Sequence, residues 1–221
     1  MRVVGGAWRG RPLVAPAGRA TRPTSDKVRE AIFDVLQALP ELRATVADFD
    51  ARFAAGDEAA EPAGQLAGQV VLDLYAGSGA LGIEALSRGA ARCTFVERER
   101  AALSALRRNL AALGVAVETG AATGPAGGDA SPAARVAAAD VRRALQADAR
   151  AGCMYTLVLA DPPYARSADA QDALSRLLGP VLAPRAVIVV ETSVKEDVVL
   201  PWRLVRAKAY GDTKVAVLAA D

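Results

Sequence analysis

The sequence predicts an α/β protein built on a doubly wound, mostly parallel, seven-stranded sheet of the Rossmann-like kind. Three observations support this fold class. Short apolar runs rich in Val, Leu and Ala alternate with stretches of helical periodicity, and a glycine-rich turn follows the first of these runs. The last two runs are separated by only three residues, which predicts an antiparallel C-terminal hairpin. A chain of 221 residues is long enough for one such domain.

The elements follow from apolar runs and their spacing. Strands are predicted at residues 70–75, 93–97, 135–139, 155–160, 186–191, 202–209 and 213–219. Helices are predicted at residues 80–88, 100–113, 141–149 and 168–182. A further helix begins after Thr24 or Ser25, either of which can cap it, and ends at Pro40. Its apolar residues have helical spacing: Val28, Ile32, Val35, Leu36 and Leu39.

The N-terminus differs from the rest in charge. Residues 1–22 predict a small β-hairpin and a basic arm, and residues 23–221 predict the main domain. Residues 1–30 hold seven basic residues against two acidic ones, whereas residues 31–65 hold two against seven. A basic arm suits contact with nucleic-acid phosphates, although an ordinary solvated face would have the same composition. Two soft stretches, near residues 41–64 and 120–134, predict flexible inserts.

The composition excludes several classes of site. The chain has no histidine, so it has no imidazole base, no Ser-His nucleophile and no His-based zinc site. Cys93 and Cys153 stand far apart in or beside apolar strands, which predicts buried free thiols. There is no signal-peptide pattern and no membrane-length apolar run. We therefore expect a cytoplasmic protein with no metal and no membrane partner, and a monomer.

Acidic residues follow three successive predicted strands. Asp73 precedes the turn with Gly77 and Gly79, Glu97 ends the next strand, and Asp140 follows the third. Gly77, Gly79 and Gly82 match G-x-G-x-x-G, a pattern that dinucleotide-binding dehydrogenases share. An acid beside the turn disfavours an anionic pyrophosphate and favours a cationic cofactor such as S-adenosylmethionine. Asp73 would attract its amino end, Glu97 its ribose and Asp140 its adenine, unless Asp73 and Asp140 merely cap or turn the chain.

The tetrapeptide Asp161-Pro162-Pro163-Tyr164 follows the fourth predicted strand. The Asp161 carboxylate and the Pro162 carbonyl can both accept hydrogen bonds from an exocyclic amino group, and Tyr164 offers a face for base stacking. The alternative is a proline-rich turn with a solvated aspartate. Beside a methyl donor, the tetrapeptide predicts methyl transfer to the amino group of a base that is single-stranded or flipped out.

Several segments together resemble one known family. Arg2-Val3-Val4-Gly5-Gly6-Ala7-Trp8-Arg9-Gly10-Arg11 and the segment from Arg22 to Glu30 are similar to the bacterial 16S rRNA guanine-N2 methyltransferases of the RsmD type. The segment from Asp73 to Ala85, the tetrapeptide at 161–164 and Tyr210-Gly211-Asp212-Thr213 share this resemblance. It implies a class I methyltransferase fold, S-adenosylmethionine as the cofactor, and a guanine 2-amino group in a partly assembled small ribosomal subunit as the acceptor.

The resemblance also implies roles for individual residues. Catalysis falls on Asp161, Pro162 and Tyr164. Cofactor binding falls on Asp73, Gly77, Gly79, Glu97 and Asp140, with Thr24 and Arg29 near the methionine end. The basic arm implies RNA contacts at Arg2, Trp8, Arg9, Arg11, Arg22 and Arg29, although partial burial of the Trp8 indole on the domain is an equal alternative.

Two other functions share some of these motifs. A DNA methyltransferase acting on adenine N6 or cytosine N4 uses the same glycine turn and the same grip on an amino group. It usually carries a larger recognition region than this chain has. A non-catalytic RNA-binding assembly factor would keep the basic arm but has no need of the acids at the strand ends.

Overall fold

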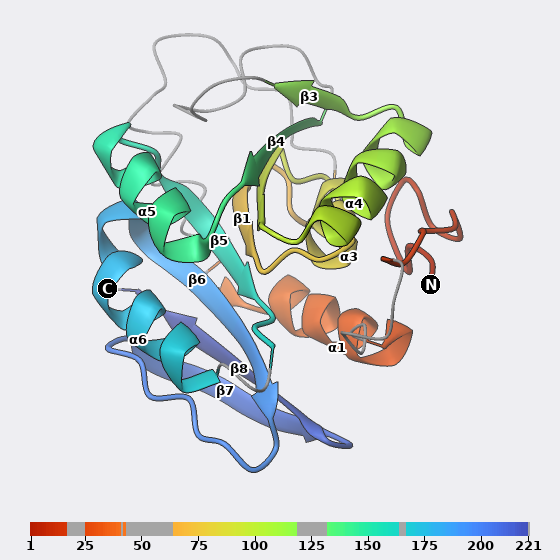
Figure 1. The fold of residues 1–221 in the computed structure, drawn as a ribbon. Coiled ribbons are helices and arrows are strands. Elements are labelled where there is room, and N and C mark those ends of the chain that lie inside the picture. The colour runs from red at the N-terminus through yellow and green to blue at the C-terminus, as the bar shows by residue number, and fades with distance from the viewer. Residues whose placement is uncertain (17–24, 41, 43–63, 119–131, 164–166, 221) are drawn as a thin grey trace, which may run out of the picture.

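The described residues form one twisted eight-stranded sheet with helices on both faces (Figure 1). The computed structural model describes residues 1–16, 25–40, 42, 64–118, 132–163 and 167–220. The strand order is β3-β4-β2-β1-β5-β6-β8-β7. The strands are β1 (Val70–Leu74), β2 (Arg92–Glu97), β3 (Ala116–Glu118), β4 (Ala133–Ala138), β5 (Tyr155–Ala160), β6 (Leu182–Ser193), β7 (Arg203–Tyr210) and β8 (Thr213–Ala219).

The pairing confirms the predicted fold class. The strands from β3 to β6 pair in parallel, whereas β8 pairs antiparallel with both β6 and β7. One strand more than predicted is present, because Ala116–Glu118 adds a three-residue edge strand beside β4. All three of its residues are exposed, so no alternation of apolar and polar residues marks it in the sequence.

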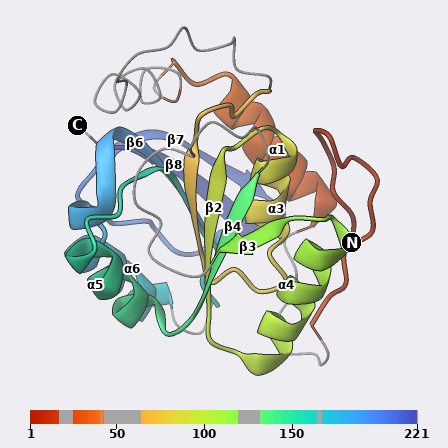
Figure 2. The same cartoon turned by 90° about the horizontal axis from the view of Figure 1, so that it is seen from above.

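The helices separate into two layers (Figure 2). α1 (Asp26–Gln37), α3 (Ala80–Ser87) and α4 (Arg100–Ala112) cover one face of the sheet. α5 (Val141–Arg150) and α6 (Ser167–Leu177) cover the other. Each layer has its own apolar core, which includes Phe33, Ile83 and Leu106 on the first face and Leu145, Leu174 and Tyr155 on the second. Cys93 and Cys153 are buried free thiols, as predicted.

The boundary between α6 and β6 lies earlier than the sequence predicts. The helix ends at Leu177, a short 3-10 turn spans Gly179–Val181, and β6 begins at Leu182. Pro180 lies within that 3-10 turn, and a proline removes a helical hydrogen-bond donor. The strand continues past Pro184 and Arg185. Arg185 has a φ of 58°, and the register between β5 and β6 shifts at this point.

The N-terminal segment, residues 1–16, folds back on itself as the predicted small hairpin: an antiparallel bridge joins Arg2 to Pro12, and the N–H groups of Val3 and Leu13 donate across it to the Arg11 and Met1 carbonyls at 3.0 Å. Its central turn packs on the end of α3, because the Ala7 N–H donates to the Ser87 carbonyl at 2.7 Å and the Trp8 N–H donates to the Ser87 hydroxyl at 2.9 Å. The two predicted inserts lie largely outside the described residues. Within the described part of the chain, no helix combines the length and apolar character needed to cross a membrane.

Candidate active site

Acidic residues occupy the carboxyl ends of four adjacent strands. Asp140 follows β4, Glu97 ends β2, Asp73 lies near the end of β1, and Asp161 follows β5. These strands are neighbours in the order β4-β2-β1-β5, so the acids form a row along one edge of the sheet. Neighbouring strands lie about 4.8 Å apart, so a row across four strands spans roughly 14 Å. Ligands of open α/β sheets bind at this edge.

The turn after β1 has a backbone that few residues other than glycine adopt. Gly77 has φ 57° and Gly79 has φ 82°, and Gly79 is the N-cap of α3. A Cβ on Gly79 would lie 2.4 Å from the Leu106 side chain, so this glycine allows close packing of the helix. A Cβ on Gly77 would meet only one atom within 4 Å, at 3.9 Å. The backbone of Gly77 is therefore open to a ligand, whereas that of Gly79 is not.

Asp73 is almost fully buried beneath the first turn of α3. Its Oδ2 accepts a hydrogen bond from the Gly82 N–H at 2.9 Å. The pKa of the Asp73 carboxyl is raised to about 8, mainly by burial; the Gly82 N–H opposes this rise, and the nearby charges of Asp161 and Glu97 contribute to it. A buried carboxyl with a strongly raised pKa, next to two other acids, marks a candidate functional site.

Backbone donors hold the Glu97 carboxylate in one orientation. Its Oε2 accepts from the Gly77 N–H at 2.8 Å, and its Oε1 accepts from the N–H groups of Arg98 and Glu99 at 2.6 and 2.7 Å. The same carboxylate therefore fixes the glycine turn relative to β2. The two carboxylate oxygens have about four acceptor sites, and these three backbone donors occupy three of them, so Oε2 can accept one more hydrogen bond, such as one from a ribose hydroxyl.

Asp140 is the N-cap of α5, as the capping alternative predicts. Its Oδ1 accepts from the Arg142 N–H at 3.0 Å, and its Oδ2 lies 3.4 Å from Arg98 Nη1. The side chain remains half exposed. Capping therefore occupies one oxygen and leaves the carboxylate accessible to a polar ligand.

Asp161 and Pro162 stand directly beside the end of β1. The Asp161 N–H approaches the Leu74 carbonyl at 3.4 Å, and the negative charge of Asp161 contributes to the raised pKa of Asp73. Pro162 is buried and Pro163 is exposed. Tyr164 lies outside the described residues, as do Thr24 and Arg22. The structure thus brings Asp161 and Asp73 together, and the stacking role of Tyr164 stays a prediction.

The basic residues of the N-terminal segment differ in how accessible their side chains are to RNA. Arg2 and Arg9 are exposed, whereas Arg11 donates from Nη2 to the Ala112 carbonyl at the end of α4, at 2.8 Å. Trp8 is half-buried and packs against the core beside α3, so its indole is only partly open for stacking.

Arg29 does not lie on the surface, where an RNA contact would require it. Its side chain is fully buried and donates from Nη2 to the Arg2 carbonyl at 2.5 Å and to Asp26 at 2.8 Å. Its Nε lies 3.6 Å from the buried Glu84 carboxylate on α3. Both partners, Arg2 and Glu84, are distant in sequence. Arg29 therefore links the N-terminal segment to α1 and α3, and RNA cannot reach the Arg29 side chain in this structure.

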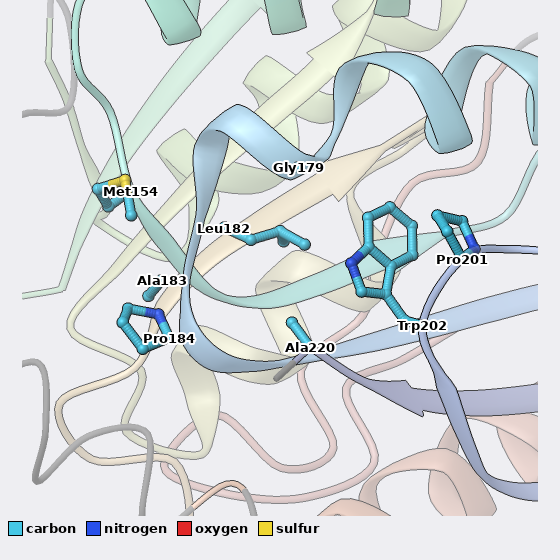
Figure 3. A pocket seen from close by; sticks show the side chains of 8 residues that line it. All are labelled: Met154, Gly179, Leu182, Ala183, Pro184, Pro201, Trp202 and Ala220. Carbon is cyan, nitrogen blue, oxygen red and sulfur yellow. The ribbon is translucent and has the colours of Figure 1, made fainter.

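A hollow elsewhere on the molecule is not part of this site. It has a volume of about 460 Å³ and lies at the opposite end of the strands, where Met154 precedes β5, Leu182 begins β6 and Ala220 follows β8 (Figure 3). Trp202 forms one wall. No polar side chain of the described site contributes to it. In the described part of the chain, no cluster of three or more acids or cysteines could hold a metal ion.

Asn109 is a site residue that the sequence does not reveal. It is buried on α4, and its Nδ2 donates to the Ser78 carbonyl in the glycine turn at 2.9 Å and to the Val14 carbonyl at 3.0 Å. Its Oδ1 accepts from the Val14 N–H at 2.8 Å. One amide therefore joins the glycine turn to the N-terminal segment. A polar residue on the apolar face of the predicted helix was the only signal available.

Comparison with known proteins assigns the chain to a family. The family model described as "Conserved hypothetical protein 95" matches residues 1–219. The "Ribosomal RNA small subunit methyltransferase D" of Escherichia coli (strain K12) is 33% identical over 214 residues, which cover 96% of this chain and 85% of the relative. A hypothetical protein from Thermus thermophilus has a similar structure, with a TM-score of 0.68 and 25% identity over 99% of this chain and 98% of its own.

The fold extends to more distant methyltransferases. An RNA methyltransferase from Salinibacter ruber, solved in complex with S-adenosyl-L-homocysteine, superposes with a TM-score of 0.53 at 16% identity, covering 90% of this chain and 93% of its own. This likeness supports the class I methyltransferase fold. The predicted family is confirmed: the chain belongs to the family described as conserved hypothetical protein 95, which includes the RsmD-type methyltransferases.

Proposed function

We propose that the protein transfers a methyl group from S-adenosylmethionine to the 2-amino group of a guanine in small-subunit rRNA. The observation that carries this proposal is the juxtaposition of Asp161 with Asp73 at the ends of adjacent strands. One acid belongs to the amino-group grip and the other to the cofactor side. The similarity to the E. coli small-subunit rRNA methyltransferase supports the choice of rRNA over DNA.

The order of the acids along the sheet edge matches the order of the groups along S-adenosylmethionine. Asp140 would hold the adenine end, Glu97 the ribose, and Asp73 the cationic amino end, with the open backbone of Gly77 between them. When bound, S-adenosylmethionine supplies an electrophilic methyl group. The chain has no histidine, so a carboxylate rather than an imidazole would accept the proton that the amino group loses.

The remaining task of the protein is to make the amino group nucleophilic. The lone pair of an exocyclic amine is delocalised into its ring, so the free amine reacts slowly. Hydrogen bonds from its two N–H groups to the Asp161 carboxylate and the Pro162 carbonyl orient the amine and increase electron density on its nitrogen. Asp161 then accepts the proton that the nitrogen loses as it becomes methylated. Pro162, which has no N–H, offers no competing donor.

The choice of guanine needs support of its own, because the Asp161 carboxylate and the Pro162 carbonyl can bind any exocyclic amino group. Its support is the resemblance to the guanine-N2 methyltransferases. The acceptor is a base in a partly assembled small subunit, where it can leave its stack and enter the site. The basic N-terminal segment, through Arg2 and Arg9, would contact the surrounding phosphates.

Nucleoside analysis tests the reaction and the base together. Small-subunit rRNA from cells lacking this protein should lose one N2-methylguanosine, which the purified protein and S-adenosylmethionine should restore. Loss of N6-methyladenosine or N4-methylcytidine would contradict the base and keep the chemistry. An unchanged rRNA with methylated DNA as the product would contradict the substrate class.

Asp161→Ala tests the assignment of the grip. We expect the variant to lower kcat by at least about 100-fold, because the amine loses its orienting acceptor and its proton acceptor. Its affinity for S-adenosylmethionine, measured by calorimetry, should stay within about twofold of the wild-type value. The matched control is Pro163→Ala, since Pro163 is exposed beside the same strand end. Equal kcat values for Asp161→Ala and the control would reject the role of Asp161.

A further inference from the structure

The outermost strand of the sheet, β7, carries basic residues that the proposed site does not use. It lies at the edge of the sheet and all of its residues are exposed or half-buried (Figure 1). Arg203, Arg206 and Lys208 lie on it, and it holds no acidic residue. Tyr210 ends the strand and begins the Tyr210-Gly211-Asp212-Thr213 turn, a motif that has no part in the cofactor site or the amino-group grip.

A bulge turns three of these side chains to one face of the sheet. Leu204 is opposite Leu218 and Arg206 is opposite Val217, so Val205 is an extra residue on β7. Opposed residues of antiparallel strands share a face. Leu218 belongs to the core under α5 and α6, whereas Val215 and Val217 belong to the core under α1, α3 and α4.

The residues after the bulge therefore lie on the face that also carries the N-terminal segment. Arg206 is opposite Val217, Lys208 is opposite Val215, and Tyr210 is opposite Thr213. Without the extra residue, strict alternation would place Arg206 and Lys208 on the other face, with Leu204. Bulges commonly redirect side chains in this way near functional sites.

The row Arg206–Lys208–Tyr210 leads toward the edge of the sheet that holds Asp161. β7 and β6 both pair antiparallel with β8, so β7 runs in the same direction as β6 and β5. Tyr210 therefore ends at the carboxyl edge, where the Val194 N–H after β6 donates to the Asp212 carbonyl at 2.9 Å. Three strand spacings separate β7 from β5, a distance of about 14 Å.

The two cations of this row are available to a ligand. Within the described residues, neither Arg206 nor Lys208 has an ion pair with an acid. The Lys208 ammonium lies 5.2 Å from the centre of the Tyr210 ring. Lys214 on β8 differs, because it donates to the Glu196 carbonyl at 2.7 Å and to Asp197 at 2.9 Å. Among the described residues, the row thus combines two cations that have no acidic partner with an aromatic ring, the combination that single-stranded nucleic acids bind.

We propose that Arg206, Lys208 and Tyr210 form a second RNA contact. It binds the single-stranded RNA next to the methylated base, on the side of that base that lies away from the N-terminal segment. This contact rests on the proposed function, since the acceptor must be RNA. The two basic surfaces lie on the same face of the sheet, with the acceptor grip of β5 between them in the strand order. Cations on an edge strand can also serve only to prevent pairing with other sheets, and this is the competing outcome of the test.

The test compares two double variants of the full-length protein. Arg206→Ala/Lys208→Ala removes the row, and Arg143→Ala/Arg150→Ala removes the same charge from exposed positions of α5, on the opposite face. The substrate is the small ribosomal particle from cells lacking the protein. We expect the β7 variant to raise KM for the particle about fivefold or more at ~0.1 M salt, with kcat and cofactor affinity unchanged.

Salt dependence provides the second readout. The affinity for small-subunit rRNA alone is measured at several salt concentrations, and log affinity is plotted against log salt. The slope should be less steep by about 1.4 in the β7 variant than in the wild type, since each of the two lost phosphate contacts contributes ~0.7. Tyr210→Ala should also raise KM for the particle, whereas Tyr210→Phe, which keeps the aromatic ring, should have the KM of the wild type. Values of KM and slope equal to those of the α5 variant would overturn the proposal, whether or not the β7 variant self-associates.

The two proposals fail in different ways. If the wild-type protein methylates no rRNA, the proposed function fails, and the slope of rRNA binding still decides whether the β7 row contacts RNA. If the wild type is active and the β7 variant matches the α5 variant in both readouts, only the second contact is wrong.

Discussion

At the scale of single residues, the site depends on how differently its carboxyl groups are solvated. Asp73 is buried and has one backbone donor, whereas Glu97 has three backbone donors and Asp140 is half exposed. Burial favours the neutral form of a carboxyl group and nearby positive charge favours the ionised form. A cationic ligand therefore changes the state of Asp73 more than that of the two others.

This difference predicts a pH dependence of cofactor binding. The pKa of Asp73 is about 8 in the cofactor-free protein, so at pH 7 most of this carboxyl is protonated. A bound cation lowers that pKa, so binding releases a proton. Affinity should therefore rise with pH, by up to about tenfold per unit below pH 8, and level off above it. Calorimetry in buffers of different ionisation enthalpy would detect the released proton.

Asp73→Asn is the control for this prediction. The amide oxygen can still accept from the Gly82 N–H but cannot ionise. We expect weaker binding of S-adenosylmethionine at pH 8.5 and no proton release at pH 7. A wild-type profile that is flat between pH 6 and pH 8 would show that Asp73 does not face the cation.

Single residues also show what a sequence can and cannot reveal about a site. The acids were predictable because the carboxyl ends of parallel strands meet at one edge, whatever the side chains around them. Arg29 was placed among the RNA contacts because it belongs to the basic region of residues 1–30, but Glu84, its buried partner, is on another helix. Pairings of this range depend on the packing of α1 against α3, which periodicity does not specify.

At the scale of elements, α3 connects the two binding regions. Its first turn supplies the Gly82 N–H to Asp73, and its last turn holds the N-terminal segment through Glu84 and Ser87. The Val4 N–H donates to Glu84 at 2.8 Å, and the Ser87 hydroxyl donates to the Gly5 carbonyl at 2.6 Å. A rigid helix two turns long therefore sets the distance between the glycine turn and the proposed RNA contact.

Two glycines of the N-terminal segment allow a matched test of this connection. A Cβ on Gly6 would lie 1.8 Å from the Ser87 carbonyl oxygen, whereas a Cβ on Gly10 would meet nothing within 4 Å. Both glycines have positive φ, 72° and 85°, so alanine strains both backbones to a similar degree. Only Gly6→Ala must displace the segment from α3.

We expect Gly6→Ala to be less stable than Gly10→Ala by about 2 kcal/mol, since hydrogen bonds worth about 1 kcal/mol each are lost. It should also raise KM for the small ribosomal particle and speed tryptic cleavage after Arg9 and Arg11, whose side chains are already exposed but whose backbone is held against α3. Thermal unfolding and limited proteolysis measure these effects. Equal behaviour of the two variants would mean that the segment is not held by Ser87.

The elements themselves were largely predictable. Strands at 155–160 and 213–219 agree with the predicted ranges, because their buried apolar runs are bounded by turn residues. The predicted helix extended past Gly179 and Pro180, which mark the end of α6 in the sequence, whereas the start of β6 was not predictable, since the strand continues through Pro184 and through Arg185 with its positive φ. Sheet pairing with β5 outweighs the local preference of those residues.

At the scale of the whole molecule, the two faces of the sheet carry different elements. α5 and α6 bury one face, while the face under α1, α3 and α4 also carries the N-terminal segment and the redirected residues of β7. RNA would then approach from one side and enter the site over the carboxyl edge. The low net charge of +2 gives no sign of this, because the charges are arranged unevenly rather than in excess.

The bonds of Asn109 predict that the two substrates affect each other. We expect RNA to raise the affinity for S-adenosylmethionine by the same factor by which S-adenosylmethionine raises the affinity for RNA. Asn109→Ala should bring this factor close to one, and Ser104→Ala, on the exposed side of α4, should leave it unchanged. Titrations of each ligand with and without the other measure the factor. A factor of one in the wild type would contradict the coupling.

The amide of Asn109 also has a consequence for evolution. Its three hydrogen bonds reach two segments that are more than 60 residues apart in sequence, Val14 and Ser78. A substitution that shifted either segment would leave the amide partly unpaired in the core, at a cost of about 1–3 kcal/mol. The N-terminal segment that we propose contacts RNA and the glycine turn of the proposed cofactor site are therefore constrained to change together. If both proposals hold, a new RNA specificity would be easier to acquire at β7 than at the N-terminus.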